Sequence, residues 1–429
     1  MSMRVILFIE NYLWLIFTVC YLYQFIYILY MIIVGKNKEE IEPEEEQFHK
    51  YGIVVAARNE ENVIGALIDS INKQNYPSEL IQIYIVADNC SDQTASVAAK
   101  KGAIVYERND RSRIGKGYAL NFLFERALKE SDCDAFIIFD ADNVVSPDYV
   151  KEINKTFCRG YKAVLGYRNS KNYATNWISA GYSLWFLRDS EYLNHPRMNL
   201  GTSCLVAGTG FLISRQILEE NGGWNYFSLT EDVEFSADMI IKGEKIGYCG
   251  KAMFFDEQPI SFKQSWVQRV RWARGFYQNV WKSGSKLLKG AVLKRNFACF
   301  DLLMSIFPAL LITLIYLVIT IIKLLVNFAI APSVNVLILG VLHLLPFMIF
   351  GYLVMYVAGL IPTITEWNQI EATSSQKILY TFTFPIFMFT FIPIAGEALF
   401  KRVEWQPVEH TIVKDIDDLM NRFKASVKE

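Results

Sequence analysis

The chain has 429 residues, of which 52% are hydrophobic, and a formal net charge of −1. This apolar excess excludes an ordinary soluble protein of this size, so membrane segments are expected. The near-zero charge gives no reason to expect a nucleic-acid partner. Seven cysteines without CxxC spacing fit reduced thiols, and four scattered histidines argue against a zinc site.

Four stretches are long and apolar enough to be membrane segments, since a crossing needs about 20 residues. They are residues 5–34, 300–328, 334–361 and 378–400. We interpret the first as a retained anchor, because no small-residue cleavage site follows its apolar core. The last contains Pro385, Pro393 and Glu397. It predicts either a kinked crossing or a re-entrant hairpin, and these two alternatives place the C-terminal tail on opposite sides of the membrane.

Between the first two spans lies a stretch of mixed composition that is long enough for one soluble domain. Lys36 and Lys38 flank it at one end and the basic run 282–295 at the other, so the positive-inside rule predicts a cytoplasmic domain in a multi-pass protein of the plasma (inner) membrane. The expected regions are an anchor at 1–35, a cytoplasmic domain at 50–260, amphipathic interface helices at 261–296, a transmembrane region at 297–402 and a tail at 403–429.

Short apolar runs alternate with helical segments along this domain. Strands are expected at 51–57, 81–87, 103–106, 135–139, 205–214 and 245–250. Strands that alternate with helices predict a parallel, doubly wound α/β sheet. Polar residues follow several of these strands, and the carboxyl ends of parallel strands face the crevice in which such sheets bind ligands.

The run AFIIFDADN at 135–143 is the stretch around which the other signals are organised. Its five apolar residues lack alternation and predict a strand buried on both faces. Asp140 and Asp142 would then lie at the end of that strand, in the crevice. Two hard carboxylate ligands, together with phosphate oxygens, suit Mg²⁺ or Mn²⁺. Taken alone, the pair is equally typical of a solvated acidic turn.

Three later stretches carry further signals. Thr230 is expected to cap a helix that begins with Glu231 and Asp232, although the helix dipole alone favours an acidic first turn. Residues 264–281 are basic and aromatic and predict an amphipathic helix in the membrane interface. The aromatic residues of 176–194 have near-helical spacing, which favours core packing, with a sugar-stacking surface as the alternative.

Together these residues resemble the motif series of the processive, membrane-embedded family 2 glycosyltransferases, which include cellulose, mixed-linkage glucan, chitin, hyaluronan and poly-N-acetylglucosamine synthases. The resemblance covers residues 50–290 and follows the family's order. The matching motifs are D (Asp88), DxD (Asp140 and Asp142), TED (Thr230, Glu231 and Asp232), QxxRW (Gln268, Arg271 and Trp272), and the segments RNEE at 58–61, GKGYALN at 115–121 and KRVEWQPVEHT at 401–411.

The resemblance implies a GT-A fold, a Rossmann-like α/β cytoplasmic domain joined to α-helical membrane segments, and it also implies roles for single residues. Asp232 would be the general base, oriented by Glu231, and Trp272 would bind the acceptor sugar. Asp140 and Asp142 would hold Mg²⁺ or Mn²⁺. The nucleotide-sugar donor would be bound by Arg58, Glu60, Asp88, Lys116, Asp140, Gln268 and Arg271.

The resemblance implies an inverting, processive transferase whose donor is a UDP-hexose, with UDP-glucose favoured. The product would be a β-glucan of the mixed-linkage or cellulose type. The enzyme would also translocate this polymer across the plasma membrane. The expected partners are the UDP-sugar, the growing polysaccharide, the lipid bilayer and accessory export or regulatory subunits. Two alternatives stay open: a poly-β-N-acetylglucosamine or other amino-sugar polymer synthase, and a non-processive transferase with a lipid acceptor. An inactive channel or scaffold is disfavoured, because all the expected acids are present.

Overall fold

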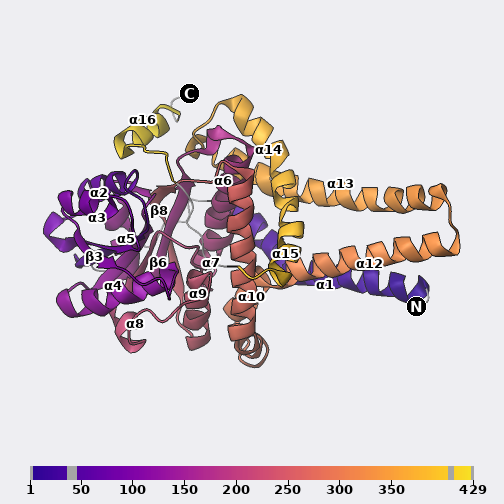
Figure 1. Cartoon of the computed structure of the whole chain (residues 1–429), viewed down its shortest axis with the longest axis horizontal. Helices are drawn as coiled ribbons and strands as arrows, with labels where there is room; N and C mark the ends of the chain where they lie inside the picture. The colour runs from indigo at the N-terminus through magenta and orange to yellow at the C-terminus, as the bar shows by residue number, and fades with distance from the viewer. Residues whose placement is uncertain (1–2, 36–45, 404–409, 427–429) are drawn as a thin grey trace.

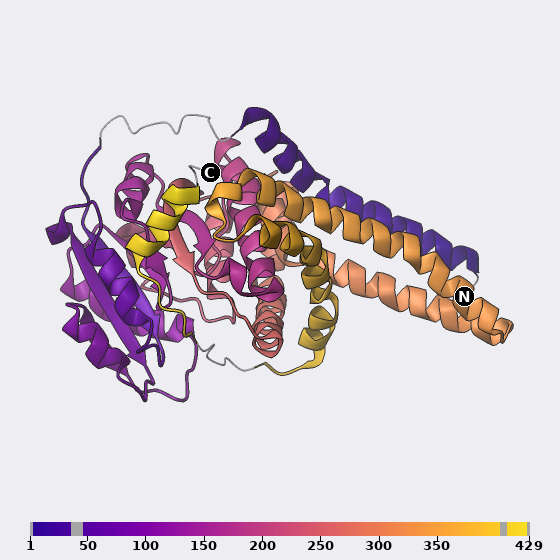
Figure 2. The same cartoon turned by 90° about the horizontal axis from the view of Figure 1, so that it is seen from above.

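The computed structural model describes residues 3–35, 46–403 and 410–426. It consists of an α/β body and an arm of long helices that projects from it (Figure 1). The arm contains α1 (Met3–Val34), α12 (Pro308–Ile330) and α13 (Val334–Thr365), which run alongside one another in both views (Figure 2).

The body is built on one eight-stranded sheet of order β3-β2-β1-β4-β7-β6-β8-β5. Its strands are β1 (Tyr51–Ala57), β2 (Ile81–Asp88), β3 (Ile104–Arg108), β4 (Ala135–Asp140), β5 (Val144–Val145), β6 (Ala163–Ser170), β7 (Phe211–Ser214) and β8 (Ile246–Asp256). The first four strands in chain order are parallel, as predicted. β7 is antiparallel to both β4 and β6, so the prediction of a fully parallel sheet is wrong.

The reversal at β7 follows from the path of the chain. After β6 the chain leaves the carboxyl edge of the sheet and forms α6 (Trp177–Asp189), a π-helical turn (Ser190–Asn194) and α7 (His195–Asn199). It then re-enters the sheet from that same edge, which forces the next strand to run backwards. The predicted strand at 205–214 is therefore shorter, and its first half is a loop beside the carboxyl edge.

Helices cover both faces of the sheet and form two apolar layers. They are α2 (Ile64–Asn72), α3 (Thr94–Lys100), α4 (Lys116–Glu130), α5 (Tyr149–Cys158), α8 (Arg215–Glu220) and α9 (Glu231–Lys242). Phe136 and Ile138 of β4 are buried in one layer, while Ile137 and Phe139 are buried in the other. Alternate side chains of one strand thus point to opposite faces, and both faces are covered, which explains the continuous apolar run.

Among the described residues, four helical segments are long and apolar enough to cross a membrane. They are Leu15–Val34, Ile312–Ile330, Met348–Thr365 and Ser374–Phe400. The first three belong to the arm, whose outer surface exposes large apolar side chains such as Leu15, Val318 and Leu353. Such a surface is stable against lipid tails and costly against water.

The fourth segment is arranged differently. It is broken at Thr390 into α14 (Ser374–Phe389) and α15 (Phe391–Phe400), which run across the base of the arm in both views (Figures 1 and 2). The tail that follows packs on the body, where the backbone N–H of Ile412 donates to Glu257 (3.0 Å) and Lys171 donates to the carbonyl of Ile412 (3.0 Å). Because α12 and α13 leave the body and return to it, one more crossing would separate the tail from the body. The packing of the tail on the body thus favours the re-entrant alternative, and the choice between it and a kinked crossing stays a prediction, because the segment is also long and apolar enough to cross a membrane.

Asp301 of α11 (Phe297–Ile306) joins the arm to the body. It accepts hydrogen bonds from the hydroxyls of Tyr23 and Tyr27 on α1, both at 2.9 Å. Arg197 of α7 donates to both of its carboxylate oxygens, at 2.8 and 2.7 Å. The Arg197 and Asp301 side chains are each only 1% exposed. We call this cluster the Asp301 clamp.

Replacing Asp301 with Asn should destabilise the protein strongly, by about 3–5 kcal/mol, because it leaves the Arg197 guanidinium buried without a counter-charge. The measurement is the thermal unfolding temperature of the purified protein in one detergent. Lys101→Gln removes a partly exposed ion pair with Asp69 and should change stability by less than about 1 kcal/mol. Equal unfolding temperatures for the two variants would contradict the assignment of the clamp.

Candidate active site

One cavity of about 970 Å³ opens at the carboxyl edge of the sheet and continues to the base of the arm. All the site residues predicted from the sequence lie on its wall. They are Arg58, Glu60, Asp88, Lys116, Asp140, Asp142, Glu231, Asp232, Gln268, Arg271 and Trp272. The acids at the strand ends converge because the parallel strands end at one edge, and the residues at the starts of two helices and on one long helix join them there. The chemical role of each residue stays a prediction.

Asp88 and Asp140 end two strands on either side of β1. In the register of the sheet, Ala56 of β1 pairs with Asp140 of β4, and Ala57 pairs with Ala87, the residue before Asp88. Asp88 is buried and accepts a hydrogen bond from Arg108 Nη1 at 2.5 Å. Burial raises the pKa of Asp88, and Arg108 opposes that shift. The pair is thus a polar anchor at the end of β2.

The two DxD carboxylates have different surroundings. Lys116 at the start of α4 contacts the Asp140 carboxylate and also donates to the carbonyl of Gly208 at 2.8 Å. Asp142 accepts from the backbone N–H of Glu257 at 2.9 Å. Burial alone would lower the pKa of Lys116, but the nearby carboxylates, first of all Asp140, outweigh burial and raise it. Lys116 is therefore a fixed positive charge beside the DxD pair.

Glu231 and Asp232 begin α9 and face the cavity. Burial and the charge of Asp232 raise the pKa of Glu231 to about 7. Burial also raises the pKa of Asp232. Thr230 occupies the N-cap position of this helix, as predicted, but its side chain makes no capping bond and its hydroxyl accepts from Asn279 Nδ2 at 2.9 Å. Two acids with raised proton affinity therefore stand side by side at the start of one helix.

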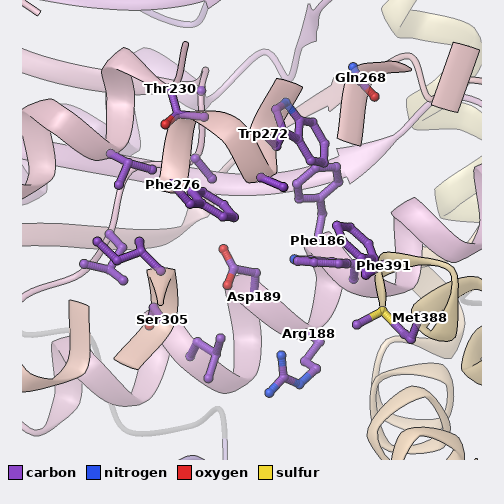
Figure 3. A pocket seen from close by; sticks show the side chains of 18 of the residues that line it. Phe186, Arg188, Asp189, Thr230, Gln268, Trp272, Phe276, Ser305, Met388 and Phe391 are labelled. Atoms are coloured by element: carbon purple, nitrogen blue, oxygen red, sulfur yellow. The ribbon is translucent and has the colours of Figure 1, made fainter. Parts of the chain in front are cut away.

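Gln268, Arg271 and Trp272 share one face of α10 (Phe262–Leu293), because residues three and four positions apart lie together on a helix. Trp272 lines the cavity and packs edge-on against Tyr182, with ring centroids 5.7 Å apart. Figure 3 shows Trp272 and Gln268 on the same side of the cavity. The Oε1 atom of Gln268 is buried and has no hydrogen-bond partner within the described chain, so it is available to a ligand.

The sequence left two explanations for the aromatic residues of α6 and the following turn, core packing and a sugar-stacking surface. Tyr182 and Tyr192 are buried in the core, as core packing predicts. Trp185 and Phe186 instead contribute to the cavity wall. Core packing therefore explains only part of the aromatic spacing.

Several charged residues on the cavity wall were missed by the sequence analysis, among them Arg168, Asp256 and His410. Arg168 of β6 donates to Asp256 (Nε to Oδ2, 2.7 Å) and lies over the ring of Phe186. His410 of the tail contacts Glu60 at 3.0 Å. Burial lowers the pKa of His410, but the surrounding carboxylates outweigh burial and raise it to about 10. Asp256 could have been found because it ends a strand, and His410 because it lies in the tail motif.

Gly208 and Gly210 keep the loop before β7 close to the site. Gly208 has a φ of +85°, and a Cβ atom there would lie 4.0 Å from Asp232 Oδ2. Gly210 has a φ of +64°, and its Cβ would overlap the ring of Phe254. Gly210 thus serves packing, while Gly208 lets the backbone approach both Asp232 and Lys116.

The donor set limits the kind of metal site that fits here. Within the described parts of the chain, no three His, Cys, Asp or Glu side chains converge as a metal cluster. Asp140 and Asp142 nevertheless offer hard oxygen ligands on the cavity wall. Mg²⁺ commonly takes one or two carboxylates and completes its shell with phosphate oxygens and water. The residues fit a metal that is shared with a bound diphosphate.

Comparison with known proteins adds the family and the fold. The chain is 28% identical to the beta-monoglucosyldiacylglycerol synthase of Synechocystis sp. over 232 residues, which are 53% of this chain and 47% of that protein. It is 23% identical to the poly-beta-1,6-N-acetyl-D-glucosamine synthase of Staphylococcus epidermidis over 275 residues, 62% of this chain and 64% of that protein. The chain thus spans less than two thirds of either relative.

The mannosyltransferase PcManGT of Pyrobaculum calidifontis, solved in complex with GDP-Man and Mn²⁺, resembles the whole chain with a TM-score of 0.57, 16% identity, and coverage of 91% of this chain and 99% of that one. The expected GT-A-like α/β fold with long apolar helices is confirmed. Residues 49–275 match the family model described as glycosyltransferase like family 2. Because this match covers more than half of the chain and contains the acids described above, the chain belongs to that family and is a family 2 glycosyltransferase.

Proposed function

We propose that the protein transfers one hexose from a nucleotide-sugar to a hydroxyl of a lipid acceptor that reaches the site from the bilayer. The observation that carries this proposal is the composition of the cavity wall between the arm helices. There it is lined mainly by apolar side chains, such as Phe17 and Ile28 of α1, Leu317 of α12 and Val354 of α13. Acyl chains are stable against such a wall, whereas a polysaccharide would lose hydrogen bonds from many hydroxyls.

This proposal adopts the lipid-acceptor alternative in place of the β-glucan polymerase expected from the sequence. It agrees with the name of the Synechocystis relative, which is a synthase of a glucosylated diacylglycerol. Four apolar segments of spanning length support a membrane location for the reaction. The orientation with the body in the cytoplasm stays a proposal based on the flanking basic residues.

The donor would lie along the carboxyl edge of the sheet, and UDP-glucose remains the favoured donor. Asp88 and Arg58 would bind the nucleoside, while Lys116, Gln268 and Arg271 would surround the diphosphate. Arg presents a planar fork to phosphate oxygens and Lys a point charge. A bound Mg²⁺ or Mn²⁺ at Asp140 and Asp142 would offset the charge that develops on the leaving diphosphate.

Asp232 would act as the general base. It takes the proton of the acceptor hydroxyl as that oxygen attacks the anomeric carbon, and the bond from this carbon to the diphosphate oxygen breaks. Attack from the face opposite the leaving group inverts the anomeric configuration. Burial raises the pKa of Asp232, which increases its affinity for the transferred proton. Glu231 beside it would tune that affinity.

A second candidate is a processive polymer synthase. Trp272 on the cavity wall favours it, since an aromatic face can stack against a sugar ring of a growing chain. The name of the Staphylococcus relative is in line with it. The two candidates share the donor site and differ in what occupies the cavity between the arm helices.

Replacing Asp232 with Asn should lower the transfer rate by about 10²–10⁴-fold, because the amide cannot accept the proton. Nucleotide binding, measured by calorimetry on the same sample, should stay at the wild-type level. Asp238→Asn is the matched control, since Asp238 lies on the same helix and pairs with Lys242 away from the cavity. Transfer by Asp232→Asn at the control rate would disprove the base assignment.

The acid limb of the pH–rate profile should shift to lower pH when Glu231 is replaced with Gln. Burial, and after it the charge of Asp232, raise the pKa of Glu231 to about 7. Because the two carboxyls are adjacent, a charge on Glu231 disfavours a charge on Asp232. The neutral amide of Gln removes this repulsion, so the base loses its proton at lower pH. The measurement is kcat/KM for transfer across pH 5–9 in the wild type, Glu231→Gln and Asp238→Asn. A shift to higher pH would contradict the pairing.

The lipid-acceptor proposal is tested with purified protein in nanodiscs, Mg²⁺ or Mn²⁺, and UDP-glucose, UDP-N-acetylglucosamine or UDP-glucuronate. Each donor is offered with diacylglycerol, a monohexosyl diacylglycerol, a polyprenyl phosphate, or no added lipid. We expect a product one sugar larger than the lipid, detected by mass spectrometry. A long polymer that forms without added lipid and is cut by a linkage-specific hydrolase would overturn the proposal.

A further inference from the structure

Arg188 and Asp189 form a charged site on the cavity wall that the proposed chemistry does not use. They are the last two residues of α6, directly before the π-helical turn Ser190–Asn194. Turns of this kind re-aim side chains and often occur at functional sites. Figure 3 shows Asp189 directed into the cavity, with Phe276, Ser305 and Arg188 around it. Both charged residues line the same cavity as Asp232.

Asp189 is a carboxylate without a partner. No hydrogen bond or ion pair reaches its side chain from the described residues, and the residue is half-buried on the cavity wall. Burial raises the pKa of Asp189, while the charges of Arg197 and Arg188 oppose that shift without contacting it. Enclosing a carboxylate without hydrogen bonds is costly. A carboxylate in that position therefore points to a ligand that donates to it.

The two neighbouring arginines, Arg188 and Arg197, differ in how many hydrogen bonds their guanidinium groups make. Arg197 makes two bonds to Asp301 and a third to Asn194, so it belongs to the Asp301 clamp. Arg188 makes one bond, from Nη2 to Gln24 Oε1 of α1 at 2.9 Å, and its Nε is buried without a partner. Arg188 is therefore partly held by α1 and still has donor capacity near the cavity.

A donor–acceptor pair of this kind matches a hydroxyl group. One hydroxyl can donate to the Asp189 carboxylate and another can accept from the Arg188 guanidinium, so both charges are satisfied. A phosphate would gain from Arg188 and be repelled by Asp189, and a hydrocarbon would leave both charges unsatisfied. The acceptor hydroxyl that reacts must lie at Asp232, so the group at Asp189 is a different hydroxyl.

We propose that Asp189 and Arg188 bind non-reacting hydroxyls of an uncharged sugar on the acceptor, so that the acceptor is already glycosylated. This inference rests on the proposed function, in which the acceptor is a lipid. A glycolipid would then place its tails along the apolar wall between the arm helices and its sugar between Asp189 and Asp232. The same contacts would serve the last sugars of a polymer, and the experiment distinguishes these two sources.

The test compares the wild type with Asp189→Asn in nanodiscs, with a monohexosyl diacylglycerol, diacylglycerol or a polyprenyl phosphate as acceptor. We expect the wild type to prefer the monohexosyl lipid. Asp189→Asn should lower kcat/KM for that lipid by about 10-fold, because the amide oxygen still accepts the hydroxyl but lacks the charge that strengthens the bond. It should leave the KM for the donor unchanged. With diacylglycerol, which has no second hydroxyl, the two proteins should react equally.

A second measurement, the thermal unfolding temperature, separates ligand binding from a structural role. The variant should unfold at or above the wild-type temperature, because Asn removes a half-buried charge that has no hydrogen-bond partner among the described residues. Glu397→Gln serves as the control, since Glu397 bonds to Trp266 and Lys401 and lies off the cavity wall. A lower unfolding temperature for Asp189→Asn, or unchanged kinetics with the monohexosyl lipid, would overturn the inference.

The remaining outcomes distinguish a failure of the lipid-acceptor function from a failure of the proposed sugar contact at Asp189 and Arg188. Preference for the polyprenyl phosphate would refute an uncharged acceptor sugar and leave the lipid-acceptor function standing. A polymer that forms without lipid, and whose elongation slows in Asp189→Asn, would refute the lipid acceptor and support the sugar contact.

Discussion

The attachment of the arm to the body at Asp301 is the interaction on which the rest of the structure depends. One carboxylate receives two tyrosine hydroxyls from α1 and both ends of the Arg197 guanidinium from α7. This fixes the membrane helices against the carboxyl edge of the sheet. The cavity exists because these two parts meet there, and its wall contains residues from both.

The same junction concentrates charge in a place where water is scarce. The acids at the strand ends are compensated by cations from distant parts of the chain: Lys116 beside Asp140, Arg108 beside Asp88, Arg168 beside Asp256 and His410 beside Glu60. Such pairs make the burial of these charges tolerable. The tail contributes to this balance only because α14 and α15 stay at the base of the arm and return it to the body.

Asp189 and Arg188 differ from these compensated pairs, and they bear on the identity of the acceptor. Among the described residues, no side chain or backbone group bonds to Asp189, and Arg188 bonds only to Gln24, where the polar part of the cavity meets its apolar part. This boundary is where an amphiphilic acceptor would place its head group, because its tails favour the apolar wall and its hydroxyls need polar partners. The chemistry of the wall therefore bears on the acceptor more directly than the family motifs, which concern the donor and the transfer step.

The sequence by itself determined the α/β class, the apolar spans and a set of residues that line the cavity at the carboxyl edge of the sheet. These features depend on local patterns, namely an apolar run ending in Asp140 and Asp142 and motifs that follow in order. Tertiary structure alone decided the reversal of β7, the course of α14 and α15, the recruitment of His410 and the exposure of Asp189 to the cavity. Each of these depends on contacts between residues far apart in the chain, such as Glu60 with His410 or Arg197 with Asp301. Local hydrophobic periodicity does not predict such long-range contacts, because the same helical pattern fits a membrane span, an interface helix or a helix that lines a cavity.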